Sequence, residues 1–177
     1  PLETAFSAAG VPVAFEGRPS LRSSALGHSL LSLLRFAWQG GERPALYAHL
    51  RSPYSGLSRR DVDWVEGKLR GRGIVRAERA IEATLELRAG RGLPTYDLAV
   101  ADEPPAAAVR ALADAMLRNA HGTLAPPLDE RSQADLRAHD AISRTLLELE
   151  TLEASGYETG RREVLAARRL SHSNIVA

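Results

Sequence analysis

The residues best suited to chemistry in this sequence lie in a basic stretch around one tryptophan. Trp64 lies four residues after Arg60 and four residues before Lys68, so the three side chains share one face of a predicted helix. An aromatic ring between two cations can stack on a nucleobase while the cations bind phosphates. With the neighbouring arginines, the predicted nucleic-acid-binding set is Arg51, Arg59, Arg60, Trp64, Lys68, Arg70 and Arg72.

A second interpretation of the tryptophan stays open. Trp64 lies off the apolar stripe of its own helix, so it can pack against another helix or against a neighbouring domain. On the residues alone, this packing role is favoured over nucleic-acid binding. The balanced net charge of +1 and the pI near 8.8 do not by themselves require a nucleic-acid partner.

No residue pattern typical of catalysis accompanies the basic stretch. The serines lack the spacing of a nucleophile elbow, and the Gly-Arg-Gly run at 71–73 lacks the context of a phosphate-binding loop. Asp63 and Glu66 can share a helix face, but a two-carboxylate site there is disfavoured. None of the histidines has metal-ligand spacing, and we expect structural roles for His28, His49, His121, His139 and His172. We therefore predict no catalytic, cofactor-binding or metal-binding residues.

The composition indicates one helical domain. The chain has 177 residues, of which 44% are hydrophobic but only 5% aromatic, so Leu, Ala and Val must fill the core. Ala and Leu favour helix over sheet. Cysteine is absent, which excludes disulfides and thiolate metal sites, and no apolar run approaches membrane-spanning length.

Apolar periodicity and capping residues predict the positions of the helices. We expect a mainly α fold, an irregular multi-helix bundle of about seven helices with one or two short strands at the termini. A helical pattern in 2–9 ends at Gly10, and a short edge strand follows in 11–15. The main predicted helices cover 23–38, 44–50, 58–69, 74–88, 105–120, 129–154 and 158–170.

Two further expectations concern the second half of the chain. Residues 89–103 are predicted to be irregular, with 96–100 extended. The helix at 129–154 would span roughly 40 Å. Its leucines occur on more than one side, which predicts a central helix.

Several segments resemble one protein family. They are the stretch 9–13 (Ala-Gly-Val-Pro-Val), the helix over 26–38, Leu50-Arg51-Ser52-Pro53, the segment 69–74 and, later, His121-Gly122 with Pro126-Pro127-Leu128 and the long helix. Together they are similar to superfamily I helicases of the UvrD/AddB type. In that family a strand like 11–13 belongs to the second RecA-like motor domain, from which a large helical insertion of the 2B type emerges.

The resemblance implies a division of the chain and a biological setting. Residues 1–20 would be a stub of the motor domain, 21–170 the helical insertion, and 171–177 a tail that re-enters the motor or is disordered. We accordingly expect a fragment of an ATP-dependent DNA helicase/nuclease of double-strand-break repair, cytoplasmic and associated with the nucleoid. The family's ATP-binding and Mg²⁺-binding residues have no matching positions here, so ATP and Mg²⁺ are expected only for the parent protein.

The resemblance also implies a role. A non-catalytic insertion would position duplex DNA, a duplex/single-strand junction or a partner helicase/nuclease subunit, with no membrane involved. The alternative is a helical protein–protein interaction module without DNA contact.

Overall fold

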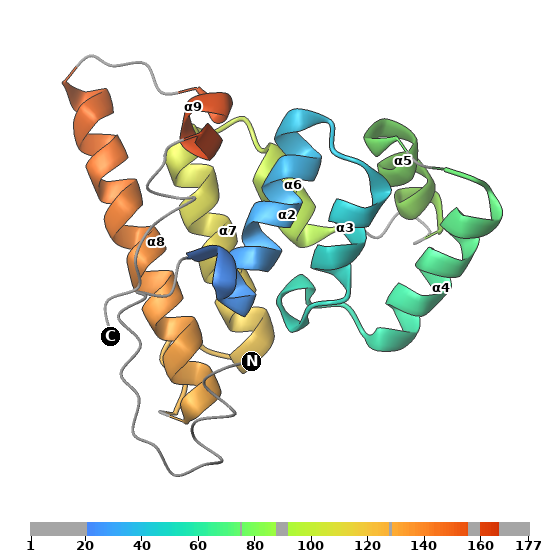
Figure 1. Ribbon diagram of the computed structural model, residues 1–177, viewed down its shortest axis with the longest axis horizontal. Helices are drawn as coiled ribbons and strands as arrows, with labels where there is room; N and C mark the ends of the chain where they lie inside the picture. The colour runs from blue at the N-terminus through green and yellow to red at the C-terminus, as the bar shows by residue number, and fades with distance from the viewer. Residues whose placement is uncertain (1–20, 75, 88–91, 128, 156–159, 167–177) are drawn as a thin grey trace, which may run out of the picture.

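The chain folds into packed helices joined by short connections (Figure 1). The computed structural model describes residues 21–74, 76–87, 92–127, 129–155 and 160–166. Within these ranges there is no strand, and the predicted mainly α fold is confirmed. The elements are η1 (Leu21–Ser23), α2 (Ala25–Gln39), α3 (Arg43–Leu50), η2 (Pro53–Ser55), α4 (Arg59–Gly71), α5 (Ala77–Leu87), α6 (Pro94–Val100), α7 (Pro105–His121), α8 (Glu130–Ala154) and α9 (Arg161–Ala166).

Some expectations fall outside these ranges. The helix in 2–9, the strand in 11–15, the motor-domain stub at 1–20 and the tail at 171–177 all lie outside the described residues. Helix α9 falls inside the predicted helix 158–170, and its Val164 and Leu165 are buried. No described helix is long and apolar enough to cross a membrane.

Helix α2 is the central helix of the fold. It contacts η1, α3, α6, α7, α8 and α9, and Leu26, Leu30 and Leu33 on it are fully buried. Local chemistry sets both ends. The Ser24 side chain accepts a hydrogen bond from the Gly27 backbone N–H at 3.0 Å, and Gly40 follows the last turn with a φ of 63°.

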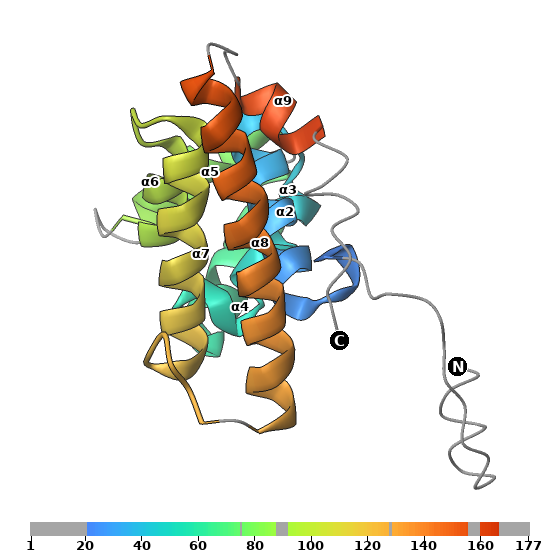
Figure 2. The ribbon, with the colours of Figure 1, turned by 90° about the vertical axis from the view of Figure 1, so that its left-hand side faces the viewer.

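The prediction that the long helix is central was wrong. Helix α8 packs along one flank, antiparallel to α7, as the two views together show (Figures 1 and 2). Ile142 and Leu146 are fully buried on its inner side, whereas Leu147 is 60% and Leu152 47% exposed. Leucines on two sides of a helix therefore did not mean burial on two sides, because folded proteins leave much apolar surface in water.

The prediction of extended backbone over 96–100 was also wrong, because this segment forms α6. Pro94 occupies the first turn, where its fixed φ suits a helix and its missing N–H is not needed. Thr95 and Ala99, one turn apart, are buried together. The Trp38 indole N–H donates to the Ala99 carbonyl at 2.6 Å, which satisfies a carbonyl near the end of this short helix.

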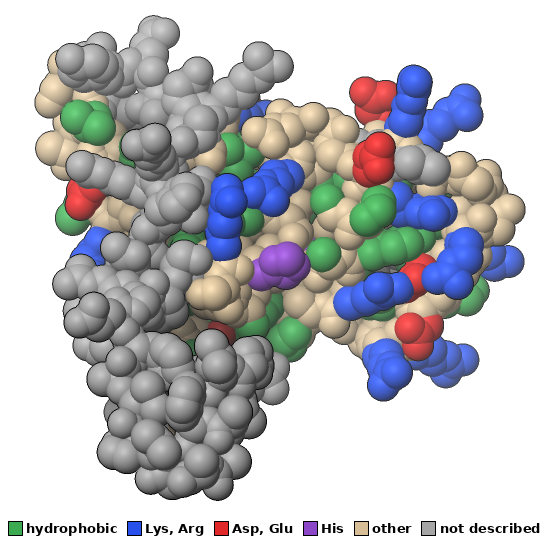
Figure 3. All heavy atoms as spheres, viewed as in Figure 1, with side chains coloured by type: hydrophobic (Ala, Val, Ile, Leu, Met, Phe, Trp, Pro, Cys, Tyr) green, Lys and Arg blue, Asp and Glu red, His purple; other side chains and the backbone are tan. Residues whose placement is uncertain are grey.

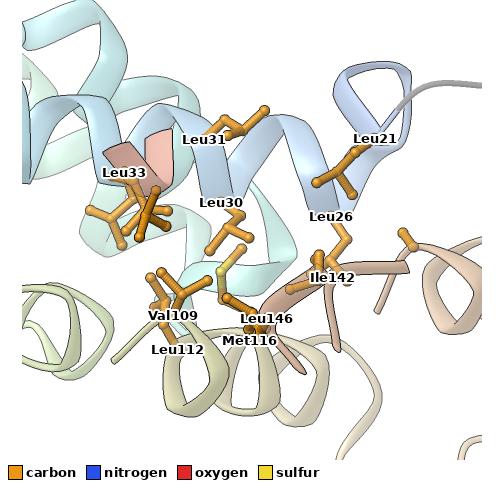
Figure 4. Close-up of a cluster of buried hydrophobic side chains, with 14 of the residues drawn as sticks. Leu21, Leu26, Leu30, Leu31, Leu33, Val109, Leu112, Met116, Ile142 and Leu146 are labelled. Carbon is orange, nitrogen blue, oxygen red and sulfur yellow. The ribbon is translucent and has the colours of Figure 1, made fainter. Parts of the chain in front are cut away.

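Two neighbouring hydrophobic clusters hold the helices together. The larger joins α2, α7, α8 and α9, and Figure 4 shows leucines of α2 facing Val109 and Met116 of α7 and Ile142 and Leu146 of α8. The smaller is formed by α3, α4 and α5 with Phe36 and Leu93. Tyr96 packs against both clusters and meets the Phe36 ring edge-on, with 6.2 Å between ring centroids. The smaller cluster carries α4, on which the candidate residues lie.

Candidate functional site

Helix α4 is fixed at both ends by its own sequence. The Ser58 hydroxyl caps the helix by accepting a hydrogen bond from the Asp61 N–H at 3.2 Å, and it donates to the Asp61 carboxylate at 2.8 Å. At the other end Gly73, with φ 64°, donates to the Arg70 carbonyl, and Ile74 donates to the Leu69 carbonyl. This pair of hydrogen bonds is a Schellman motif. It separates α4 from α5, which therefore begins at 77 rather than at the predicted 74.

The side of α4 away from the core carries Trp64. The apolar stripe of this helix consists of Val62, Val65 and Leu69 and is buried, whereas Trp64 is 47% exposed. Nearly half of Trp64 is therefore accessible to solvent. Arg60 and Lys68, one turn to either side, are exposed as well.

Two glycines leave the surroundings of the ring open. Gly67 and Gly71 follow Trp64 at three and seven residues, on the same side of α4. A Cβ atom placed on either glycine would have no neighbour within 4 Å. We call Arg60, Trp64 and Lys68 the Trp64 face.

A single buried carboxylate holds two of the candidate arginines. Glu66 is only 6% exposed, and it pairs with the guanidinium groups of Arg51 and Arg70, the latter at 2.6 Å. The hydrogen bond from Arg51 is the main cause that lowers the pKa of Glu66. Arg51 also stacks over the Tyr47 ring, 5.7 Å from its centroid. Because Glu66 forms ion pairs with both arginines, it does not form with Asp63 the two-carboxylate site considered from the sequence.

The other predicted cations divide into paired and unpaired groups. Arg72 pairs with Glu86 at 3.0 Å, and Arg59 lies 3.9 Å from Asp63. Within the described ranges, neither Arg60 nor Lys68 forms an ion pair. Figure 3 shows basic side chains gathered over the lobe of α4 and α5, with acidic groups between them. Of the predicted cations, the two beside Trp64 are thus the ones without a carboxylate partner among the described residues.

Sequence reasoning missed a buried polar cluster around His49. His49 is fully buried in α3, with Nδ1 at 2.9 Å from the Ser29 hydroxyl and Nε2 at 2.9 Å from the Thr95 hydroxyl. The Ser52 hydroxyl donates to the His49 carbonyl and lies 2.8 Å from the Ser29 hydroxyl. Burial lowers the pKa of His49 to about 4. The imidazole is therefore neutral at pH 7, and the cluster ties α2, α3 and α6 together.

Two further histidines join α7 to α8. His121 Nε2 lies 2.9 Å from the Asp135 carboxylate, whose other oxygen accepts a hydrogen bond from the Tyr54 hydroxyl at 2.7 Å. His139 Nε2 lies 2.7 Å from the Asp114 carboxylate. These are contacts of structural histidines, and the histidine and carboxylate partners are far apart in sequence, so no local spacing could have indicated them.

The described residues contain no cluster of three or more side chains that could hold a metal ion. The seven predicted residues all lie on or beside α4, but they do not form one surface. The structure brings together Arg60, Trp64 and Lys68, and it places Arg51 and Arg70 around Glu66 instead.

Comparisons with known proteins found no relative of this chain. No family model matches the chain, and neither the curated proteins nor the solved structures contain a match.

Proposed function

We propose that this chain is a non-catalytic helical module of a DNA-processing protein and that it binds nucleic acid through the Trp64 face. One observation carries the proposal. Of the predicted cations around α4, Arg60 and Lys68 are the ones without a carboxylate partner among the described residues, and they lie on either side of an exposed tryptophan.

The chemistry of this face suits a flexible nucleic-acid strand. Exposed cations bind phosphates and release counterions, and an uncovered indole ring can stack on a base of any sequence. Gly67 and Gly71 leave room beside the ring for a base to approach. The paired arginines are less suited to this task, because a phosphate would compete with an existing carboxylate for each of them.

The resemblance to UvrD/AddB-type proteins supplies the context of the proposal. In that setting the helices within 21–170 would be the insertion that positions a duplex or a duplex/single-strand junction for a motor elsewhere in the parent protein, in a nucleoid-associated complex with a partner subunit. ATP and Mg²⁺ would belong to the parent. We assign no reaction to this chain, and DNA-stimulated ATP hydrolysis by the purified chain would contradict this assignment.

Binding to a fluorescent duplex with a single-stranded tail tests the proposal. We expect the chain to bind with a steep dependence on salt. The double substitution Arg60→Ala/Lys68→Ala should reduce the slope of log affinity against log salt by about 1.5, because two phosphate contacts are lost.

The control carries Arg118→Ala and Arg137→Ala, two exposed arginines of α7 and α8. It should leave the slope unchanged. Absence of binding, or an equal loss in the control, would refute the proposal and favour the alternative of a protein–protein interaction module.

A further inference from the structure

Helices α4 and α5 form a lobe at one side of the fold (Figure 1). They pack closely against each other, and neither packs as closely against any other described element. The smaller hydrophobic cluster attaches this lobe to α3, with Val62, Val65 and Leu69 from α4 and Leu46 and Leu50 from α3. Among the described residues, the larger cluster includes none from α4 or α5. The lobe can therefore separate from α3 while the larger cluster stays buried.

Three side chains at α3 form a row that faces the lobe. They are Arg43, Tyr47 and Arg51, which follow one another at intervals of four residues along one side of the helix. Each guanidinium lies over the Tyr47 ring, 5.7 Å from its centroid. We call these three residues the α3 row.

The α3 row donates hydrogen bonds to the side of α4 that faces it. Arg51 Nε donates to the Glu66 carboxylate at 3.0 Å, and the Tyr47 hydroxyl donates to the Glu66 carbonyl at 3.2 Å. Arg43 donates to the Leu69 carbonyl at 3.4 Å. Because the Glu66 carboxylate is buried, its pair with Arg51 must break whenever α4 leaves α3.

Helix α4 has a weak helical sequence of its own. Gly67 lies in its interior and Gly71 is its last residue, and glycine loses more conformational freedom in a helix than alanine does. Helix α7, by comparison, is rich in alanine and contains no glycine. Short helices take most of their stability from packing, so α4 depends on its contacts with α3 and α5.

We propose that α4 and α5 open as one unit while α2, α7 and α8 stay folded, and that the pairing of the α3 row with Glu66 holds this unit closed. Local openings of this kind involve segments with few buried contacts to the rest of a protein. The opening moves the helix that carries the Trp64 face. It goes beyond the proposed function, because neither the opening nor its test involves nucleic acid.

Hydrogen exchange of the whole chain, followed by mass spectrometry at increasing urea concentrations, tests the proposal. Relative to their intrinsic rates, amides of α4 and α5 should exchange at least about tenfold faster than those in the middle of α2, α7 and α8. Their exchange should also depend less on urea, because the opening exposes less surface than complete unfolding. The same protection and the same urea dependence in all five helices would overturn the proposal.

A substitution in the larger cluster separates local opening from unfolding of the whole chain. Ile142→Val should speed exchange in α2, α7 and α8 about fivefold, because it weakens a cluster that only complete unfolding exposes. It should change exchange in α4 and α5 less than about twofold, since that cluster stays intact in the open form. Equal acceleration in all five helices would show that the lobe does not open by itself.

Glu66→Gln tests the part of the proposal that concerns the α3 row. The substitution keeps the shape of the side chain and removes the charge that pairs with Arg51, so exchange in α4 and α5 should become about tenfold faster. Glu86→Gln is the control, because Glu86 pairs with Arg72 inside the lobe and both side chains are substantially exposed. It should change this exchange less than about threefold.

Equal effects of the two glutamine variants would refute the role of the α3 row. Failure of the opening in these experiments leaves the nucleic-acid function untouched. Conversely, failure of the chain to bind the tailed duplex would refute the nucleic-acid function and leave the opening in place.

Discussion

At the scale of single residues, the neighbours of each cation decide what it is available to bind. Glu66 occupies Arg51 and Arg70 at once, whereas Arg60 and Lys68 have no such partner within the described ranges. The sequence analysis took the six cations around α4 as one set, although i,i+4 pairs such as Glu66–Arg70 can be read from the sequence. The contact from Arg51, fifteen residues away, depends on how α3 packs against α4.

His49 gives a prediction at the same scale. Burial lowers its pKa from 6.5 to about 4, so the unfolded chain takes up a proton at a pH where the folded chain does not. Stability is therefore present above about pH 6.5 and is lost as the pH falls toward about 4. Between pH 7 and pH 5 this effect amounts to about 2 kcal/mol.

Urea denaturation of the wild-type chain and of His49→Gln at the two pH values measures this loss. The wild-type free energy of unfolding should fall by about 2 kcal/mol more than that of the variant, whose side chain does not titrate. Identical losses in both proteins would show that His49 is not held neutral in the folded state.

At the scale of elements, the close approach of η1 to α2 depends on a glycine. A Cβ atom at Gly27 would lie 2.0 Å from the Leu21 carbonyl oxygen and 2.6 Å from the Leu21 side chain, which is fully buried. Gly27→Ala should therefore destabilise the fold by about 1–3 kcal/mol, although alanine is the better helix former.

Gly67 in α4 is the matched control for that substitution. Nothing lies within 4 Å of a Cβ atom there, so Gly67→Ala should stabilise the chain by up to about 1 kcal/mol. Thermal or urea denaturation of the two variants measures the difference. A stabilising effect of Gly27→Ala would contradict the observed packing of η1.

The elements that were predicted well are those whose ends are set by local chemistry. Helix α4 begins after the Ser58 cap, one residue from the predicted start at 58, and α7 ends before Gly122, with φ 73°, one residue from the predicted end at 120. Helix α6 was missed because its short apolar pattern fits a strand as well as a helix, and the contact from Trp38 that supports it comes from α2. The position of α8 on a flank depends on how all the helices pack together. The apolar pattern of one helix does not encode this packing.

At the scale of the whole molecule, the two hydrophobic clusters leave α4 at one side of the fold (Figure 1). The position of Trp64 off the inner stripe of α4 follows from helical periodicity and was predicted, whereas its exposure was not, because the sequence favoured packing of the ring. The pocket that Leu50, Leu57 and Val62 line was not predictable, because its residues come from separate elements and meet only in the folded chain. Burial of His49 was not predictable for the same reason, since Ser29 and Thr95 belong to α2 and α6.

The central claim is that nucleic acid contacts the Trp64 face, and tryptophan fluorescence tests it most directly. The chain has two tryptophans. Trp38, the other one, is partly buried, and its indole N–H donates a hydrogen bond to the Ala99 carbonyl of α6. Titration with a single-stranded oligonucleotide should quench the emission of the wild-type chain, whereas Trp64→Phe, which retains Trp38, should show no quenching. Oligonucleotide binding that leaves the wild-type emission unchanged would contradict the claim, as would equal quenching in the variant.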